Sequence, residues 1–241
     1  MHISFTLTTA PKMTESITVH LIGDSTMAEK AASERPETGW GTPFTHRLDD
    51  SVTVENHACN GRSTRTFLEE GRWKPVVRRL GENHYVFVQF GHNDEVPSKE
   101  QHTTEEQFVT NLEKFAEETR ERGATAVFLT PIARRHFDED GELKNTHRVY
   151  SELIRDVARA RDVPLIDADE RSQSLLGELG PERSKSLYNH LPPGEHPNYP
   201  DGVADNTHFS ESGARQMADL VLDGVEALDL ELATHVVRDD Q

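Results

Sequence analysis

The chain has 241 residues, of which 43 are acidic and 26 are lysine or arginine, so its formal net charge at pH 7 is −17. This charge opposes binding to nucleic acid, whose phosphates require clustered lysine and arginine, and it equally opposes docking on anionic membranes. The single cysteine, Cys59, excludes an intrachain disulfide and a thiolate metal cluster. No apolar run approaches the length of a transmembrane helix.

The chain is expected to form one domain, because no linker rich in glycine, serine or proline interrupts it. Residues 1–15 are expected to be an unstructured extension, residues 16–230 the domain and residues 231–241 a C-terminal tail. Residues 1–14 lack a basic segment followed by an apolar stretch, which predicts a cytoplasmic location, and Met13 is an alternative start. The excess of acidic residues, with arginine outnumbering lysine, resembles proteins adapted to high salt; an ordinary acidic cytosolic protein is the alternative.

Five short segments rich in valine and isoleucine predict strands of a sheet that is buried on both faces. They are residues 17–22, 52–56, 85–89, 126–129 and 163–167. Three helices are predicted between and after them, at residues 104–122, 144–161 and 210–228, from apolar side chains at helical spacing.

Alternating strands and helices predict an α/β fold, a three-layer α/β/α sandwich around a five-stranded parallel sheet. Residues 188–207, rich in proline, glycine, histidine and asparagine, are the one long stretch predicted to be irregular. The carboxyl ends of parallel strands meet at one edge, where open α/β sheets bind their ligands. Polar motifs that follow the first three strands are therefore expected to lie together.

A candidate nucleophile follows the first strand. Ser25 comes after Gly23, which allows a sharp turn that raises the serine hydroxyl above the sheet at the start of a helix. A serine hydroxyl needs a base that is oriented by a carboxylate, and Asp205 and His208, in a loop before the last helix, are candidates. The alternatives are a plain turn at Ser25 and an N-cap beside a surface imidazole.

Acyl transfer also requires hydrogen-bond donors for the oxyanion of the tetrahedral intermediate. The candidates are the backbone N–H groups of Ser25 and Gly61 and the side-chain amide of Asn93. At Gly61 the missing Cβ would allow close approach of the backbone, although a tight turn explains a glycine equally well. An Asx-turn is the alternative at Asn93.

The four positions Ser25, Gly61, Asn93 and His208 match the four sequence blocks of the SGNH (GDSL-type) hydrolases, and the chain resembles specifically the rhamnogalacturonan acetylesterases of that superfamily. The stretches that carry the resemblance, spread between about residues 17 and 228, are IGDSTM (22–27), NGRST (60–64), EGRW (70–73), QFGHND (89–94), TPIARRHFDEDG (130–141) and GEHPNYPDGVADNTHFSESG (194–213). The resemblance implies the flavodoxin-like SGNH hydrolase fold and neither a cofactor nor a metal.

The resemblance also implies a role for each catalytic position. Ser25 is implied as the nucleophile, His208 as base and acid, Asp205 as the residue that orients His208, and Ser25, Gly61 and Asn93 as the oxyanion hole. The expected reaction removes acetyl groups from acetylated, pectic oligo- or polysaccharides through an acyl-enzyme. A GDSL-type lipase or thioesterase, an acetylxylan esterase and a non-catalytic carbohydrate-binding protein are the alternatives.

Substrate-binding residues are predicted from the loops. Arg134, Arg135 and His136 follow the fourth strand, where paired guanidinium groups suit a galacturonate carboxylate, unless they balance the acidic residues that follow them. Trp73 and Tyr199 are candidates for contact with sugar rings, with a tightly packed loop as the alternative. A metal site among the histidines is disfavoured, because the chain shows neither His-x-x-x-His spacing nor a Cys-x-x-Cys pair.

Overall fold

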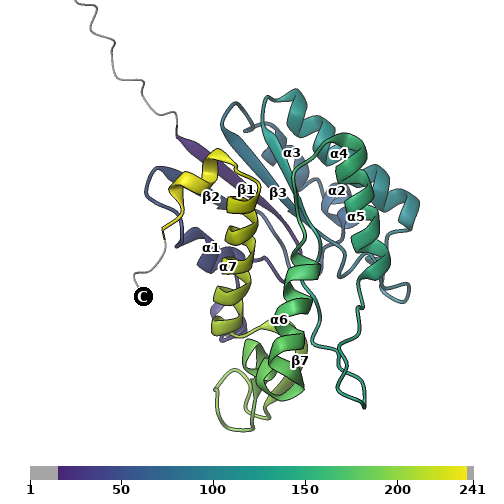
Figure 1. The fold of residues 1–241 in the computed structure, drawn as a ribbon, viewed down its shortest axis with the longest axis vertical. Coiled ribbons are helices and arrows are strands. Elements are labelled where there is room, and N and C mark those ends of the chain that lie inside the picture. Colours follow the sequence, from purple (N-terminus) through teal and green to yellow (C-terminus); the bar gives the residue numbers. More distant parts are fainter. Residues whose placement is uncertain (1–15, 238–241) are drawn as a thin grey trace, which may run out of the picture.

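The computed structural model describes residues 16–237 and contains a five-stranded parallel sheet with the strand order β2-β1-β3-β4-β5 (Figure 1). The strands are β1 (Ile17–Gly23), β2 (Val52–Asn56), β3 (His84–Gln89), β4 (Thr125–Leu129) and β5 (Leu165–Ile166). The predicted α/β fold and its five strands are confirmed. Strand β5 is shorter than predicted, since Pro164 has no N–H for the sheet and contributes only its carbonyl, which accepts from Phe128 N at 2.9 Å.

The three long predicted helices are present as α4 (Glu105–Glu121), α5 (Arg148–Arg161) and α7 (Glu211–Ala227). Thr104 and Ser210 cap α4 and α7 through their side chains. Helix α5 begins later than predicted, because Asn145 Oδ1 accepts the N–H of His147 at 3.0 Å and holds a turn there. The other helices are α1 (Gly41–Thr45), α2 (Thr64–Glu69), α3 (Trp73–Val77) and α6 (Ala168–Arg183).

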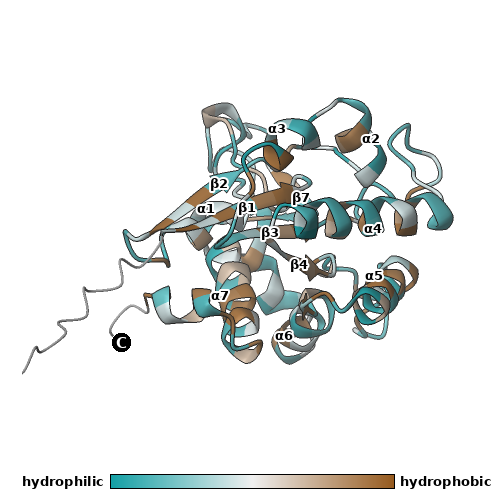
Figure 2. Cartoon of the chain, turned by 90° about the horizontal axis from the view of Figure 1, so that it is seen from above, coloured by the Kyte–Doolittle hydropathy of each residue, from teal (hydrophilic) through white to brown (hydrophobic). Residues whose placement is uncertain are grey.

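Two apolar clusters lie on opposite faces of the sheet. One joins alternate residues of β1, such as Leu21, to α1, α6 and α7; the other joins Ile22 to α2, α3, α4 and α5. In Figure 2 the sheet is seen between α2 and α3 on one side and α6 and α7 on the other. The middle layer is therefore covered on both faces, as the continuous apolar strands require. None of the described helices is both long enough and apolar enough to cross a membrane.

The segment predicted to be irregular is in part a β-hairpin, which corrects the prediction that Asp205 and His208 lie in a loop. Strand β6 (Tyr188–Leu191) pairs antiparallel with β7 (Val203–Phe209), and both catalytic candidates lie in β7. The two strands pair irregularly. One residue of β6 separates two paired positions that four residues separate on β7, so residues 205–208 bulge out of the ladder.

The structure describes the two ends of the chain only in part. Residues 1–15, predicted to be an extension, lie outside the described residues. Residues 231–241 were expected to be a tail, and their first part forms a 3₁₀ helix, Glu231–His235, whose Leu232 is fully buried against the cluster of α7. Short 3₁₀ helices also occur at Ala32–Glu34 and Ser184–Leu187.

Candidate active site

The nucleophile candidate, Ser25, follows β1, where the strand order reverses: β2 lies on one side of β1 and β3 on the other. Gly23 is required there because a Cβ would lie 2.6 Å from the carbonyl oxygen of Gln89 on β3. Just beyond, Asp24 Oδ1 accepts from Thr26 N at 2.9 Å and from Thr26 Oγ1 at 2.8 Å. This turn fixes the backbone around Ser25, whose side chain is 9% exposed.

A continuous hydrogen-bonded chain joins the three catalytic candidates. Ser25 Oγ lies 2.8 Å from His208 Nε2, and His208 Nδ1 lies 2.7 Å from Asp205 Oδ2. The other carboxylate oxygen of Asp205 accepts the backbone N–H groups of Thr207 at 2.7 Å and His208 at 3.0 Å. The bulge of β7 thus holds both members of the pair on one side, where a regular strand would separate positions i and i+3.

The charges within the hydrogen-bonded chain favour the protonated form of His208. Burial lowers the pKa of His208, but the hydrogen bond and charge of Asp205, together with Glu37, outweigh it and raise the pKa above 6.5. Burial raises the pKa of Asp205, but its hydrogen bonds and the charge of His208 lower it to about 2. Asp205 is therefore ionised at neutral pH and stabilises a protonated His208.

Gly61 and Asn93, two of the three predicted oxyanion donors, line the same pocket, of about 380 Å³, as Ser25 and His208. Gly61 has φ +74°, and a Cβ there would meet no atom within 4 Å, so the turn, not close approach of another backbone, accounts for the glycine. Asn93 Nδ2 donates to Arg62 O at 3.1 Å, and its Oδ1 accepts from Lys99 Nζ at 3.1 Å. Both ends of the Asn93 amide are thus held in place.

Asp94 joins the loop after β3 to the start of α2. Its Oδ1 accepts from Thr64 N at 2.9 Å and Thr64 Oγ1 at 2.6 Å, and its Oδ2 accepts from Gly91 N at 3.2 Å. Burial raises the pKa of Asp94 to about 6 against these hydrogen bonds. The carboxylate therefore fixes the loops that carry Gly61 and Asn93 relative to each other.

Residues 21–216 match the GDSL-like lipase/acylhydrolase family. The chain belongs to this family. It is 43% identical over 226 residues to the rhamnogalacturonan acetylesterase RhgT of Bacillus subtilis, a match that covers 93% of this chain and 96% of that protein. It is 28% identical to the rhamnogalacturonan acetylesterase of Emericella nidulans, over 92% of this chain and 90% of that protein.

Solved structures show the same fold at lower identity. Protein YxiM of Bacillus subtilis superposes with a TM-score of 0.76 at 24% identity, over 90% of this chain and 58% of that one. The acetylxylan esterase Axe2 of Geobacillus stearothermophilus superposes with a TM-score of 0.65 at 19% identity, over 94% and 98% of the two chains.

The pocket of this GDSL-family chain carries charged residues that the sequence motifs did not reveal. Lys30 is 5% exposed and pairs with Glu37 at 2.6 Å, and it also donates to Asn60 Oδ1 at 2.8 Å. Lys99 lies beside Asn93, and both lysines line the pocket. Lysine is rare in this sequence, which could have drawn attention to Lys30 and Lys99, but their spacing did not indicate that they share one pocket. Glu37, Asp205 and His208 also place possible cation ligands within 4.8 Å of one another.

His92 is a second unrecognised pocket residue. It is 3% exposed, and its two ring nitrogens have no hydrogen-bond partner among residues 16–237. Its ring packs edge-on against His147, with centroids 4.4 Å apart. Burial, followed by the neighbouring cations, keeps the pKa of His92 well below 6.5, so the ring is neutral. The position of His92 next to Asn93, in the segment Gly91–Asp94, could have indicated that it lies in the pocket.

The predicted substrate-binding residues separate into two groups. Arg134 lines the catalytic pocket, where it forms an ion pair with Glu95. Arg135 is 8% exposed and does not line it; its guanidinium donates to Asn206 Oδ1 at 2.8 Å and Ser184 Oγ at 3.1 Å. The structure therefore does not bring the two guanidinium groups into one pocket, because successive side chains of an extended segment point in opposite directions. His136 is exposed and also lies outside the lining.

The two aromatic candidates do not line this pocket either. Trp73 is 2% exposed, packs against Phe115 and donates from Nε1 to Glu118 at 2.6 Å. Tyr199 donates its hydroxyl to the carbonyl of Glu34 at 2.9 Å. The structure therefore does not place either aromatic side chain in the pocket of Ser25.

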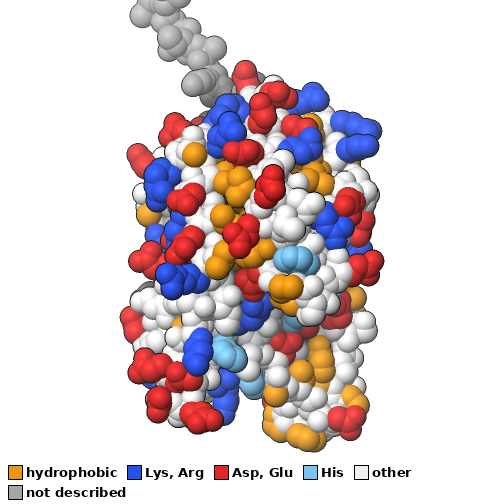
Figure 3. Space-filling view, turned by 90° about the vertical axis from the view of Figure 1, so that its right-hand side faces the viewer, with side chains coloured by type: hydrophobic (Ala, Val, Ile, Leu, Met, Phe, Trp, Pro, Cys, Tyr) orange, Lys and Arg blue, Asp and Glu red, His pale blue; other side chains and the backbone are white. Residues whose placement is uncertain are grey.

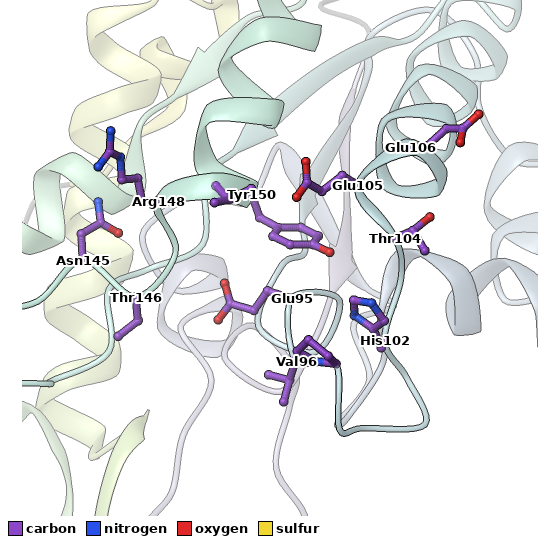
Figure 4. A pocket seen from close by; sticks show the side chains of 12 residues that line it. Glu95, Val96, His102, Thr104, Glu105, Glu106, Asn145, Thr146, Arg148 and Tyr150 are labelled. Atoms are coloured by element: carbon purple, nitrogen blue, oxygen red, sulfur yellow. The ribbon is translucent and has the colours of Figure 1, made fainter.

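A larger groove, of about 980 Å³, lies beside the catalytic pocket and is shown in Figure 4. Glu95 lines the groove, and one of its carboxylate oxygens contacts Arg134, which lines the catalytic pocket; its other oxygen lies 2.9 Å from His147 Nδ1. Tyr150 points into the groove and donates its hydroxyl to the carbonyl of Thr103. The Glu95–Arg134 ion pair thus forms part of the wall between the groove and the catalytic pocket.

Proposed function

We propose that this protein is a serine acetylesterase that removes acetyl groups from acetylated, rhamnogalacturonan-type pectic oligo- or polysaccharides. The observation that carries the proposal is the hydrogen-bonded chain from Ser25 through His208 to Asp205, which opens into a pocket lined by Gly61 and Asn93. The 43% identity to RhgT over most of both chains supports the substrate class.

The proposed reaction has two acyl-transfer steps. Ser25 Oγ attacks the acetyl carbonyl carbon while His208 Nε2 takes its proton, and the negative oxygen of the tetrahedral intermediate is met by N–H donors from Ser25, Gly61 and Asn93. The intermediate expels the sugar alkoxide, which receives the proton from His208 and leaves an acetyl-Ser25 ester. Water then attacks this ester while His208 takes one of its protons, and the second tetrahedral intermediate expels Ser25 Oγ, which receives that proton as acetate leaves.

Arg134 is the proposed contact for an acidic sugar. Its guanidinium lines the catalytic pocket and donates to the carbonyl of His92 at 3.0 Å, which orients the group. A galacturonate carboxylate would share the guanidinium with Glu95, and guanidinium groups suit such planar bidentate pairing. The net charge of −17 makes local cations necessary for an anionic sugar to bind at all.

The experiment is to measure acetate release from acetylated rhamnogalacturonan oligosaccharides and from acetylated xylan, with Ser25→Ala as the control. We expect preferential release from the pectic substrate and none above background in the variant. Release from xylan alone would keep the esterase mechanism and reject the pectic assignment. Equal release by wild type and Ser25→Ala would reject both.

A lipase or thioesterase is tested by p-nitrophenyl esters of rising chain length, because such an enzyme needs an apolar channel for the acyl chain. The pocket is instead lined mainly by polar and charged side chains. We expect activity to fall steeply beyond acetate. We also propose, from the excess of acidic residues, that the protein is adapted to salt.

A further inference from the structure

Three histidines and one glutamate gather on the sheet outside the catalytic pocket. His20 lies on β1 and is the register partner of Glu55 on β2, while His57 follows the last residue of β2. His84 is the first residue of β3, on the other side of β1. Paired positions on neighbouring strands place side chains on the same face, so these four residues meet over the β2-β1-β3 edge of the sheet.

Three possible ligand atoms of this cluster form a nearly equilateral triangle. His20 Nδ1 lies 3.2 Å from His57 Nε2 and 3.4 Å from Glu55 Oε2, and His57 Nε2 lies 3.3 Å from the same oxygen. A tetrahedral Zn²⁺ with bonds of about 2.0–2.1 Å separates its ligand atoms by about 3.3 Å. Octahedral Mg²⁺ with bonds of about 2.1 Å would place neighbouring ligand atoms at about 3.0 Å. The triangle matches the tetrahedral ion.

One set of tautomers directs the lone pairs of the triangle inward. His20 Nε2 lies 3.0 Å from His84 Nδ1, and when His20 Nε2 donates this hydrogen bond, His20 Nδ1 carries no proton and its lone pair is free to bind a metal ion. Glu55 Oε1 accepts from Arg79, whereas Glu55 Oε2 is buried and has no hydrogen bond of normal geometry to any residue in 16–237. Such outer partners orient the ligands of known metal sites and fix their tautomers.

The cluster is closed on one side and open on the other. The side chain of His20 is 1% exposed, whereas those of Glu55 and His57 are 20% and 24% exposed. The inner ligand is therefore rigid, and an ion can enter from the solvent side, where water can supply a fourth ligand. Arg79 forms an ion pair with Glu55 and offsets part of its negative charge, which weakens the attraction for any cation. The two neutral imidazoles then favour zinc, because calcium and magnesium prefer oxygen ligands.

We propose that His20, Glu55 and His57 bind one Zn²⁺-like ion in tetrahedral geometry. The ion would tie the edge strand β2 to β1 at the start of the segment that leads to Gly61. That segment is already held by His57 N to Leu21 O at 2.8 Å and by Cys59 N to Gly23 O at 3.0 Å. The site is structural and does not depend on the esterase proposal.

The test uses full-length protein that is free of any histidine tag and has been stripped of metal with a chelator. Titration with Co²⁺ is followed by visible absorption, which is much stronger for tetrahedral than for octahedral Co²⁺, and Zn²⁺ is then added in competition. We expect one Co²⁺ per chain with a tetrahedral spectrum, displacement by Zn²⁺ and a rise in the Tm with Zn²⁺.

Variants locate the ion. His57→Gln and Glu55→Gln, at partly exposed positions, are expected to weaken binding by at least about a hundredfold, while exposed His46→Gln, as the matched control, leaves it unchanged. His208→Ala is also expected to keep full binding. The proposal is overturned by the absence of a tetrahedral Co²⁺ spectrum, by loss of binding in His208→Ala, or by unchanged binding in both ligand variants with native circular dichroism.

Discussion

Ser25 and His208 meet across 183 positions of sequence in a single 2.8 Å hydrogen bond, and each is expected to be individually indispensable. Ser25→Ala or His208→Ala removes an atom that forms or breaks a bond, so turnover should fall by several orders of magnitude. Asn93→Ala removes one of three oxyanion donors and should cost about 10²–10³. Steady-state kinetics on p-nitrophenyl acetate measure this order, and equal, mild losses in all three variants would contradict it.

In the proposed mechanism, Asp205 makes the activity depend on pH through His208. The base acts only when neutral, and its pKa is raised above 6.5, so kcat/KM should fall as the pH drops through that raised value. Asp205→Asn removes the main cause of the raised pKa, and we expect the acid limb to move to lower pH while the plateau falls by about 10³–10⁴. A pH–rate profile from pH 4 to 9 measures both; an acid limb that stays in place would contradict the assignment.

The same carboxylate also links pH to stability. The pKa of Asp205 is about 2 in the folded protein against an ordinary value of 3.8, so its stabilising contribution is present above about pH 4 and is lost as the pH falls toward 2. Asp94 acts in the opposite direction. Its pKa of about 6 means that the folded state binds the proton more tightly, so stability from this group falls as the pH rises from about 4 to 6.

Sequence reasoning identified the residues of the hydrogen-bonded chain and some, but not all, of the residues around it. Ser25, Gly61 and Asn93 each follow a strand, and parallel topology brings such positions to one edge of the sheet. Lys30 and Lys99 line the same pocket from segments with no periodic pattern. Their positions depend on how the loops pack, which single-sequence patterns do not encode.

At the scale of elements, the β6–β7 hairpin decides what the two neighbouring arginines do. Arg135 holds the bulge of β7 through Asn206, whereas Arg134 faces the catalytic pocket. Arg135→Ala should lower the free energy of unfolding by about 1–3 kcal/mol, because it removes a buried guanidinium that donates to Ser184 Oγ and Asn206 Oδ1, and it should reduce kcat on neutral and acidic acetylated sugars alike. Arg134→Ala should raise KM only for acidic sugars.

This pair of variants is measured by urea unfolding and by kinetics on acetylated galacturonate and acetylated xylose oligosaccharides. A selective loss on acidic sugars in Arg135→Ala, with stability unchanged, would restore the predicted arginine clamp and contradict the structural role. The hairpin itself could not be predicted from alternation, since its strands are short and the bulge breaks the period of two at Asp205 and His208. Helix α6 was missed because its apolar side chains form no clear stripe at helical spacing; Gly180 and Pro181 kink it only near its end.

At the scale of the molecule, the sequence predicted the sheet but not the side-chain cluster that the sheet brings together. The sequence order of strands and helices was enough to predict the sheet, since β-α-β connections permit few arrangements. It could not predict the cluster of His20, Glu55 and His57, whose members come from different strands and share no spacing motif. Figure 3 shows acidic and basic side chains interspersed over one face. The 26 lysines and arginines offset most of the 43 acidic residues, and the remaining excess gives the net charge of −17.

That net charge predicts a dependence on salt. Repulsion between the excess carboxylates destabilises the compact state at low ionic strength, and molar salt reduces the Debye length to about 3 Å. We expect the Tm to rise between 0.05 M and 2 M NaCl, with potassium chloride giving the same result. A Tm that stays constant or falls would contradict adaptation to salt and favour an ordinary acidic protein.

The most direct test of the esterase account is covalent labelling by a fluorophosphonate, followed by peptide mass spectrometry. The reagent reacts with a serine that a neighbouring base activates, so we expect one label per chain, on the peptide that contains Ser25, and slow or absent labelling in His208→Ala. Labelling of a different serine, or equal labelling rates in wild type and His208→Ala, would contradict the assignment of Ser25 and His208 as nucleophile and base.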